Sequence, residues 1–208
     1  HQGPAYLERI ELTFVPESMI RYSSLLAGQH DFTLDAPTQN AAAIRANPEL
    51  VLHSRIRKGN PFRSVTFNTE RFPFDDVRVR KALTQAIDRE GLAWVIGFGE
   101  YQTKSDYLAI NTRFYDPSFT EALKYDPQAA ARLLDEAGWS ERDADGIRIK
   151  DGQRLSVKLL MSENPAFPSS VAVAIQSDAR KAGVQIELEV LPLVQATERR
   201  YSGDYQLL

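Results

Sequence analysis

Apolar and polar residues alternate in several short stretches of the chain, the pattern of strands that bury one face. In the first of them Ile10, Leu12 and Phe14 alternate with polar neighbours. Near the end of the chain, Gln185, Glu187 and Glu189 occupy every second position. The predicted strands cover residues 9–15, 31–34, 50–56, 64–68 and 184–190. Strands are therefore expected along most of the sequence.

Between these stretches, apolar residues recur with the period of amphipathic helices. Glycines that can adopt the left-handed conformation of a helix end follow most of these stretches. The predicted helices cover residues 17–27, 41–46, 77–87, 89–96, 127–137 and 169–182. Strands and helices thus alternate, which is typical of an α/β protein.

The stretch from Phe67 to Glu90 has the most regular pattern. It predicts the end of a strand, a turn at Pro73, an amphipathic helix and the start of a second helix. We expect Asp75 to cap the first helix and Asp76 to lie favourably against its positive end. One buried stripe of this helix consists of Val79, Ala82, Leu83, Ala86 and Ile87.

The second half of the chain begins at Asp126, a predicted N-cap, with Pro127 at the first helical position. Asp151 and Gly152 separate two alternating runs and predict a hairpin turn. Strand, helix and strand then follow in an order that implies a right-handed parallel crossover. No period persists between residues 98 and 117, so this stretch is the predicted linker between two α/β units.

Composition excludes several classes of function. The 208 residues are 43% hydrophobic and 25% charged, with a net charge of −3, which fits a globular protein but no nucleic-acid groove. Cysteine is absent, and no apolar run approaches the roughly 20 residues that cross a bilayer. The length fits one large domain or parts of two. Because the chain starts without methionine and stops inside an apolar run, we expect a fragment of a longer protein.

Catalytic and metal-binding patterns are not found in the sequence. His1, His30 and His53 lack metal-ligand spacing, and no nucleophile elbow, phosphate loop or dinucleotide fingerprint occurs. Arg78 and Arg80 diverge on a helix and cannot form one anion clamp. Residues 198–200 are expected to form a solvated charge run. We therefore predict no catalytic residue, no metal and no cofactor.

Candidate ligand-binding residues come from strand ends and from aromatic side chains. Asn68 follows a predicted strand, and ligands of open α/β sheets gather beyond the carboxyl ends of strands. The alternative is that its amide fixes the following turn. Tyr101, Tyr107 and Tyr115 could line a cleft between domains, or could pack against the linker.

Four motifs in the right order resemble the family 5 extracytoplasmic solute-binding proteins of ABC importers. The resemblance is carried by PAYLERIELTFVPESMIRYSSLLAGQHDF, by FNTERFPFDDVRVRKALTQAIDRE, by YDPQAAARLLDEAGW and by DGIRIKDGQRLSVKLL. The ordered set covers nearly the whole chain and is more specific than any one motif.

The resemblance implies an α/β fold with mixed sheets, formed by parts of two lobes of a type II, cluster C-like periplasmic-binding-protein fold. Residues 1–98 would be a later part of lobe I, 99–112 the interlobe connection and 113–208 the beginning of lobe II. The implied protein is a periplasmic or extracytoplasmic monomer. It would capture a small solute, foremost a peptide, between its lobes and deliver it to the ABC permease subunits of the inner membrane.

Two alternatives stay open at this stage. A sensor or chaperone-like binding module can use the same fold, because fold does not fix function. An α/β enzyme whose catalytic residues lie outside the fragment is the other alternative. Among solutes, opines, glycosides and metal chelates compete with peptides.

Overall fold

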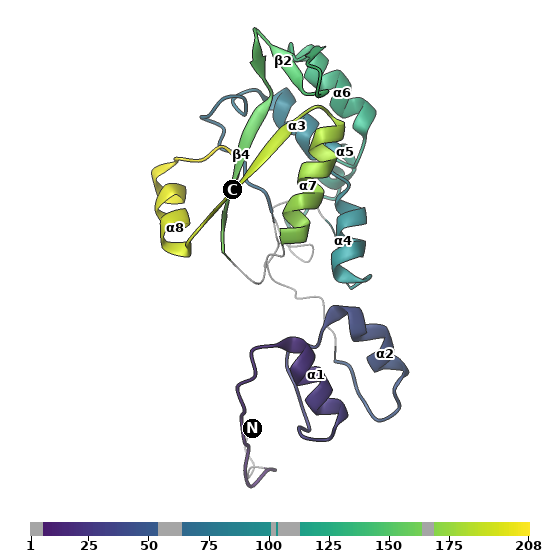
Figure 1. Ribbon diagram of the computed structural model, residues 1–208. Helices are drawn as coiled ribbons and strands as arrows, with labels where there is room; N and C mark the ends of the chain where they lie inside the picture. The colour runs from purple at the N-terminus through teal and green to yellow at the C-terminus, as the bar shows by residue number, and fades with distance from the viewer. Residues whose placement is uncertain (1–5, 54–63, 101–102, 104–112, 164–168) are drawn as a thin grey trace. The chain divides into compact units, whose positions relative to one another are not determined.

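A computed structural model describes residues 6–53, 64–100, 103, 113–163 and 169–208 of the chain (Figure 1). The chain divides into two compact units, which we call the N-terminal unit (His1–Arg55) and the C-terminal unit (Ile56–Leu208). Each is described by itself.

The N-terminal unit contains two α-helices, α1 (Ser18–Leu26) and α2 (Ala41–Ala46), with the 3₁₀-helix η1 (Thr38–Asn40) directly before α2. These helices confirm the two predicted from periodicity, and Gly28 has the left-handed φ of +68° expected after α1. Its buried apolar residues among those described are Tyr22, Pro37, Ala41 and Ile44.

The predicted strands at 9–15 and 31–34 are absent from this structure. Neither segment has a bridge partner among the described residues, and a strand exists only through pairing. The same holds for residues 50–53, and the rest of that predicted strand lies outside the described residues. Alternation alone therefore did not identify paired strands in these segments.

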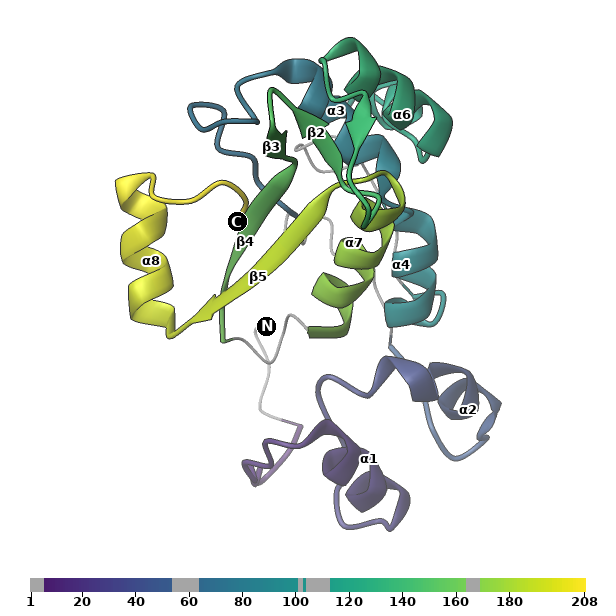
Figure 2. The same ribbon diagram turned by 45° about the horizontal axis from the view of Figure 1, so that its top comes forward.

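The C-terminal unit is organised around two parallel strands, β4 (Ser156–Ser162) and β5 (Gln185–Leu191), joined through α7 (Ser169–Lys181). The register pairs Val157 with Ile186 and Leu159 with Leu188. The predicted parallel crossover is thus confirmed. Figure 2 shows α7 and α8 (Leu193–Ser202) on opposite sides of this strand pair.

Two further extended segments lie beside β4. Leu207 forms a parallel bridge with Leu159 and an antiparallel bridge with Phe67. Thr66 and Leu208 exchange backbone hydrogen bonds of 2.7 and 3.0 Å. Residues 64–68 therefore pair through a bridge rather than as the full strand predicted. The resulting order is β5, β4, the segment at 207 and the segment at 67, which makes the sheet mixed as expected.

The amphipathic helix in the central stretch is α3 (Val77–Ala86), and its N-cap differs from the prediction. Asp76, not Asp75, accepts the hydrogen bond from the backbone N–H of Arg78, at 2.8 Å. The Arg78 side chain folds back onto the same carboxylate, at 2.7 Å. The prediction was off by one residue because either aspartate precedes the helix closely enough to cap it.

Replacing Asp76 with alanine is expected to lower the free energy of unfolding by about 1 kcal/mol, whereas Asp75→Ala should change it by less than about 0.5 kcal/mol. Hydrogen bonds from Arg78 lower the pKa of Asp76 from its usual 3.8. A carboxylate with a lowered pKa stabilises the fold above its unfolded-state pKa and loses this effect as the pH falls. Urea unfolding at several pH values should therefore show the Asp76→Ala deficit at pH 7 and its disappearance in acid. Equal deficits for both variants would contradict the assigned cap.

The next helix, α4 (Arg89–Gly97), follows directly and begins as predicted. Asp88 caps it by accepting a hydrogen bond of 2.9 Å from the N–H of Gly91. Further along, the short α5 (Ser118–Ala122) was not predicted from periodicity. It precedes α6 (Pro127–Glu136), where Asp126 accepts from the N–H of Ala129 at 2.9 Å. The N-cap aspartates therefore predicted the first residues of α4 and α6 correctly.

One hydrophobic core joins α3 to α6, α7 and the β4–β5 pair. Its largest members include Phe74, Leu83, Leu134, Trp139, Leu155, Val157, Ile175 and Ile186. These side chains come from both sides of residues 99–112. The assignment of 1–98 and 113–208 to different lobes stays a prediction, but α3 and α4 belong to the same compact unit as the second half of the chain.

A small antiparallel sheet precedes β4. It contains β1 (Glu141–Arg142), β2 (Arg148–Lys150) and β3 (Gln153–Arg154). The turn between β2 and β3 is the predicted one, and both Asp151 and Gly152 have positive φ, at 50° and 76°. This is the backbone of a two-residue hairpin turn, and it confirms the prediction.

Candidate functional site

The carboxyl ends of β4 and β5 lie at one edge of the mixed sheet, because these two strands are parallel. Ligands of open α/β sheets bind beyond this kind of edge. The described residues at this edge are Ser162 at the end of β4, Glu163 directly after it, and Leu191 at the end of β5. The N–H of Glu163 donates to the carbonyl of Leu191, at 3.1 Å, which holds the two strand ends together. We call this the carboxyl edge.

Asn68 lies toward the opposite edge. The segment at 67 is antiparallel to the segment at 207, so its end lies beside the start of residues 206–208. The N–H of Asn68 accordingly donates to the carbonyl of Gln206, at 2.9 Å. The sequence argument for Asn68 assumed that residues 64–68 run parallel to the neighbouring strands. The observed segment runs antiparallel to its neighbour, so this reason for expecting a ligand contact no longer applies.

The side-chain amide of Asn68 is hydrogen-bonded to the chain itself. Its Nδ2 donates to the carbonyls of Gly203 and Tyr205, both at 3.0 Å. Its Oδ1 accepts from the N–H of Glu70 at 3.1 Å. Both amide protons and one oxygen lone pair are thus used. Only the bond from Glu70 lies in the following turn, as the structural alternative for this residue expected, whereas the two bonds from Nδ2 hold the 203–205 turn. A ligand contact by Asn68 stays a prediction.

Replacing Asn68 with alanine is expected to lower the free energy of unfolding by about 1–3 kcal/mol, because two partly buried carbonyls lose their donors. The Asn68→Asp variant keeps the acceptor for Glu70 but loses both donors, and it should be destabilised to a similar degree. Chemical denaturation measures both effects. Unchanged stability combined with a large loss of ligand affinity in the full-length protein would instead identify Asn68 as a ligand contact.

The other predicted site residues are three tyrosines. Tyr101 and Tyr107 lie outside the described residues. Tyr115 is described and is half-buried. A role for these tyrosines in ligand binding stays a prediction.

A group of charges lies next to the residues that Asn68 holds. Arg199 of α8 pairs with Glu189 of β5 at 2.6 Å and with Asp204 at 3.0 Å. The hydrogen bond that the Arg199 guanidinium donates to Glu189 is the main cause of the raised pKa of Arg199. Residues 198–200 were predicted to be a solvated charge run, and for Arg199 this was wrong because α8 turns it toward β5 and the 203–205 turn.

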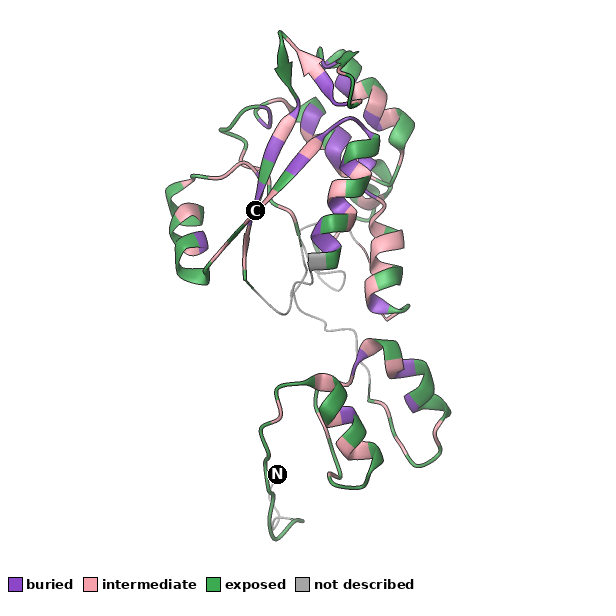
Figure 3. Ribbon diagram, in the orientation of Figure 1, coloured by how far each residue is buried: buried purple, intermediate pink, exposed green. Residues whose placement is uncertain are grey.

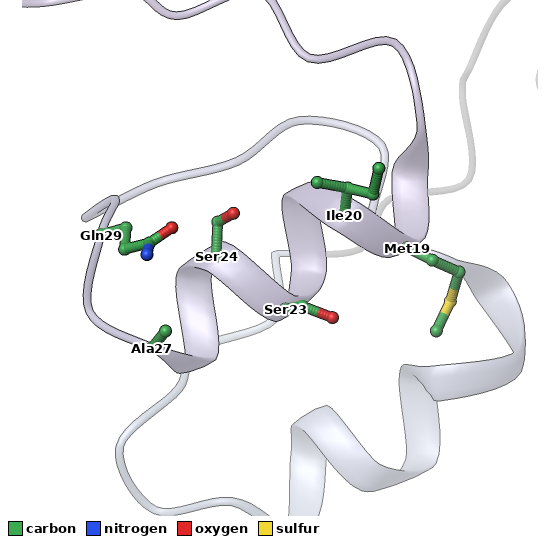
Figure 4. A pocket seen from close by; sticks show the side chains of 6 residues that line it. All are labelled: Met19, Ile20, Ser23, Ser24, Ala27 and Gln29. Carbon is green, nitrogen blue, oxygen red and sulfur yellow. The ribbon is translucent and has the colours of Figure 1, made fainter.

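A shallow hollow of about 360 Å³ lies in the N-terminal unit on α1 (Figure 4). It is lined by uncharged side chains, namely Met19, Ile20, Ser23, Ser24, Ala27 and Gln29. Such a lining offers neither acid–base groups nor charged anchors for a ligand. Asn68 and Tyr115, the predicted site residues that the structure describes, do not line this hollow.

Among the described residues, no three His, Cys, Asp or Glu side chains gather in a way that could hold a metal ion. None of the described helices is both long and apolar enough to cross a membrane.

The fold is that of the periplasmic binding proteins. In a solved structure, NikA from Brucella suis in complex with Fe(III)-EDTA, the match has a TM-score of 0.73 at 24% identity and covers 93% of this chain and 39% of that one. The family model of the bacterial extracellular solute-binding proteins, family 5, middle region, matches residues 1–208. The chain belongs to this family, as the four sequence motifs predicted.

Curated relatives agree with this membership. The heme-binding protein A of Haemophilus influenzae is 29% identical over 184 residues, covering 88% of this chain and 32% of the relative. The oligopeptide-binding protein AppA of Bacillus subtilis is 27% identical over 195 residues, covering 91% of this chain and 35% of the relative. The chain therefore spans about a third of the length of these relatives.

Proposed function

We propose that this chain is part of the solute-binding component of an ABC importer, which captures a peptide between two lobes and delivers it to a membrane permease. The observation that carries the proposal is the family match over residues 1–208. It is supported by a fold shared with solved binding proteins and by a relative named for oligopeptide binding. The proposed activity is capture without chemistry.

The structural basis of capture would be a difference in affinity between two arrangements of the lobes. A ligand that contacts both lobes in the closed arrangement shifts the protein toward it by no more than the difference in its affinity for the two states. The closed form would then be the one that the permease recognises. We propose an extracytoplasmic monomer for this task.

Within this chain, we propose that the carboxyl edge contributes to the ligand-binding wall. The support is the parallel direction of β4 and β5, which brings Ser162, Glu163 and Leu191 to the same edge. We further propose that residues 99–112 connect the two lobes and that Tyr101 and Tyr107 contact the ligand. Tyrosine suits that role because it offers an apolar face and a polar tip.

A thermal-shift screen of the full-length protein tests the substrate class. Ligands that bind only the native state raise the melting temperature in proportion to the logarithm of their concentration. We expect short peptides to raise it, and hemin, nickel chelates and Fe(III)-EDTA to leave it unchanged. If only one of the competing ligands raises the melting temperature, that ligand would replace peptide as the proposed solute. The proposal of solute capture would stand.

A further inference from the structure

The last turn of α4 exposes three large apolar side chains that neighbour one another. Trp94, Val95 and Phe98 are 70%, 69% and 54% exposed. Residues three and four positions apart share one face of a helix, so Trp94 and Val95 both lie beside Phe98. Another face of α4, with Leu92 and Ile96, packs against the hydrophobic core. Figure 3 shows exposed positions at the lower end of this helix. Single exposed apolar residues are common, but such a cluster is typical of a contact surface.

The backbone at the end of α4 is strained where it presents Phe98. This residue has a φ of 50° and a ψ of 38°, the left-handed region that bulky side chains rarely adopt. Gly99, directly after it, also has a positive φ, of 83°. The N–H of Phe98 donates to the carbonyl of Trp94 at 2.8 Å, which closes the turn. Helices commonly end with glycine in this conformation, and here the residue is phenylalanine. Strained positions of this kind gather at ligand-binding sites.

The indole of Trp94 is held against the backbone of the same turn. A Cβ on Gly99 would lie 3.1 Å from Cζ3 of Trp94, so the ring packs over this glycine. The ring is therefore fixed on one side while most of the residue stays in water. An aromatic side chain that is already held in place loses little conformational freedom when a ligand binds.

The exposed cluster lies at the same end of the C-terminal unit as the carboxyl edge. The crossover helix α7 leaves the carboxyl end of β4 and returns to the start of β5, so its last residues lie at the opposite end. There Asp178 accepts a hydrogen bond of 3.1 Å from the N–H of Asp88, at the start of α4. Figures 1 and 2 both show α4 running from this point alongside α7, toward the end of the unit at which β4 and β5 end.

We propose that Trp94 and Phe98 bind an aromatic side chain of the captured peptide, so that the protein prefers peptides with such a residue. The inference rests on the proposed function, because it places the cluster on the ligand-binding wall that includes the carboxyl edge. Aromatic rings that stack or meet edge to face attract each other beyond the effect of buried area. The three side chains of the cluster are uncharged, so they select an apolar side chain rather than a charged terminus of the peptide.

Matched tripeptides test the inference by isothermal titration of the full-length protein. We expect Ala-Phe-Ala to bind about 10-fold more tightly than Ala-Ala-Ala. Trp94→Ala should remove most of this preference and leave the affinity for Ala-Ala-Ala within about two-fold. Tyr201→Ala is the matched control, because Tyr201 is 83% exposed near the end of α8, on the other side of the strand pair. It should change neither affinity.

The titrations separate this inference from the proposal that it rests on. If both tripeptides bind equally well, or if Trp94→Ala keeps the preference for Ala-Phe-Ala, the aromatic contact is wrong and the capture of peptides stands. If neither tripeptide binds, the proposed peptide substrate fails together with this inference.

Replacing Phe98 with glycine separates binding from packing. Glycine adopts the left-handed conformation without strain, so Phe98→Gly should not lower the melting temperature of the full-length protein. We expect it to weaken the binding of Ala-Phe-Ala by about 3-fold or more. A lower melting temperature with unchanged affinity would show that Phe98 packs within the protein, and would overturn its assignment to the ligand.

Hydroxyl-radical labelling followed by mass spectrometry measures the exposure of Trp94 without any substitution. In the ligand-free full-length protein we expect Trp94 to be labelled, and saturating Ala-Phe-Ala should protect it. Protection without ligand would show that polypeptide from outside residues 1–208 covers the cluster, and would overturn the inference. Labelling that Ala-Phe-Ala does not change would overturn it as well.

Discussion

Replacing Arg148 with methionine is expected to lower the free energy of unfolding by about 3–5 kcal/mol. Arg148 is only 3% exposed. Its Nη1 bonds the carbonyl of Trp139 and the carboxylate of Asp135, both at 2.5 Å, and its Nε bonds the carbonyl of Ala182 at 2.9 Å. These partners lie at the ends of α6 and α7, so a single guanidinium joins both helix ends to β2. Methionine fills the space but leaves the buried carbonyl of Trp139 without this donor. The Asp135 carboxylate is 54% exposed to water, and the Ala182 carbonyl keeps only the longer bond from Nη2 of Arg142, at 3.4 Å.

The matched control is Arg154→Met. Arg154 pairs with Asp143 at 2.9 Å and with Asp145 at 3.1 Å, but its side chain is 43% exposed. Exposed pairs of this kind contribute about 1 kcal/mol or less, since water replaces the lost partner. Urea unfolding followed by circular dichroism compares the variants. Similar losses for Arg148→Met and Arg154→Met would show that the buried hydrogen bonds of Arg148 do not hold this part of the fold together.

The second large effect is expected for Gly183→Ala, with a loss of about 2–4 kcal/mol. Gly183 follows α7 with a φ of +88°, which an L side chain adopts only with strain. A Cβ at this position would lie 2.6 Å from Nη1 of Arg142 and 2.7 Å from Cγ of Arg148. Both arginines would have to move, and the movement would disturb the bonds that Arg148 makes.

Gly152→Ala separates backbone strain from crowding. Gly152 has a φ of +76°, but a Cβ there would meet nothing within 4 Å. Only the cost of the left-handed conformation remains, about 1–2 kcal/mol. Thermal unfolding of both variants should therefore show the larger loss for Gly183→Ala. Equal losses would mean that the two arginines adjust without cost.

Local signals predicted the helices and the hairpin well. Asp126 with Pro127, and Asp151 with Gly152, determine backbone geometry within a few residues, so their structures follow from sequence. Where two aspartates competed to cap α3, the spacing could not decide between them, and the structure selects Asp76.

Long-range features were not available from the sequence. The direction of residues 64–68, which moves Asn68 away from the carboxyl edge, depends on pairing with Leu207, about 140 residues later in the chain. The buried role of Arg148 has no local signal either, because its partners come from α6 and α7. Sequence motifs identified the family, whereas the contacts of individual candidate residues required the fold.

We propose that the whole protein captures a solute without transforming it. Isothermal titration of the full-length protein with a short peptide, followed by mass analysis of the recovered peptide, tests it most directly. We predict saturable binding of one peptide per protein, with the peptide recovered intact. Cleavage or modification of the peptide would contradict the claim, as would the absence of saturable binding for peptides, hemin and metal chelates alike.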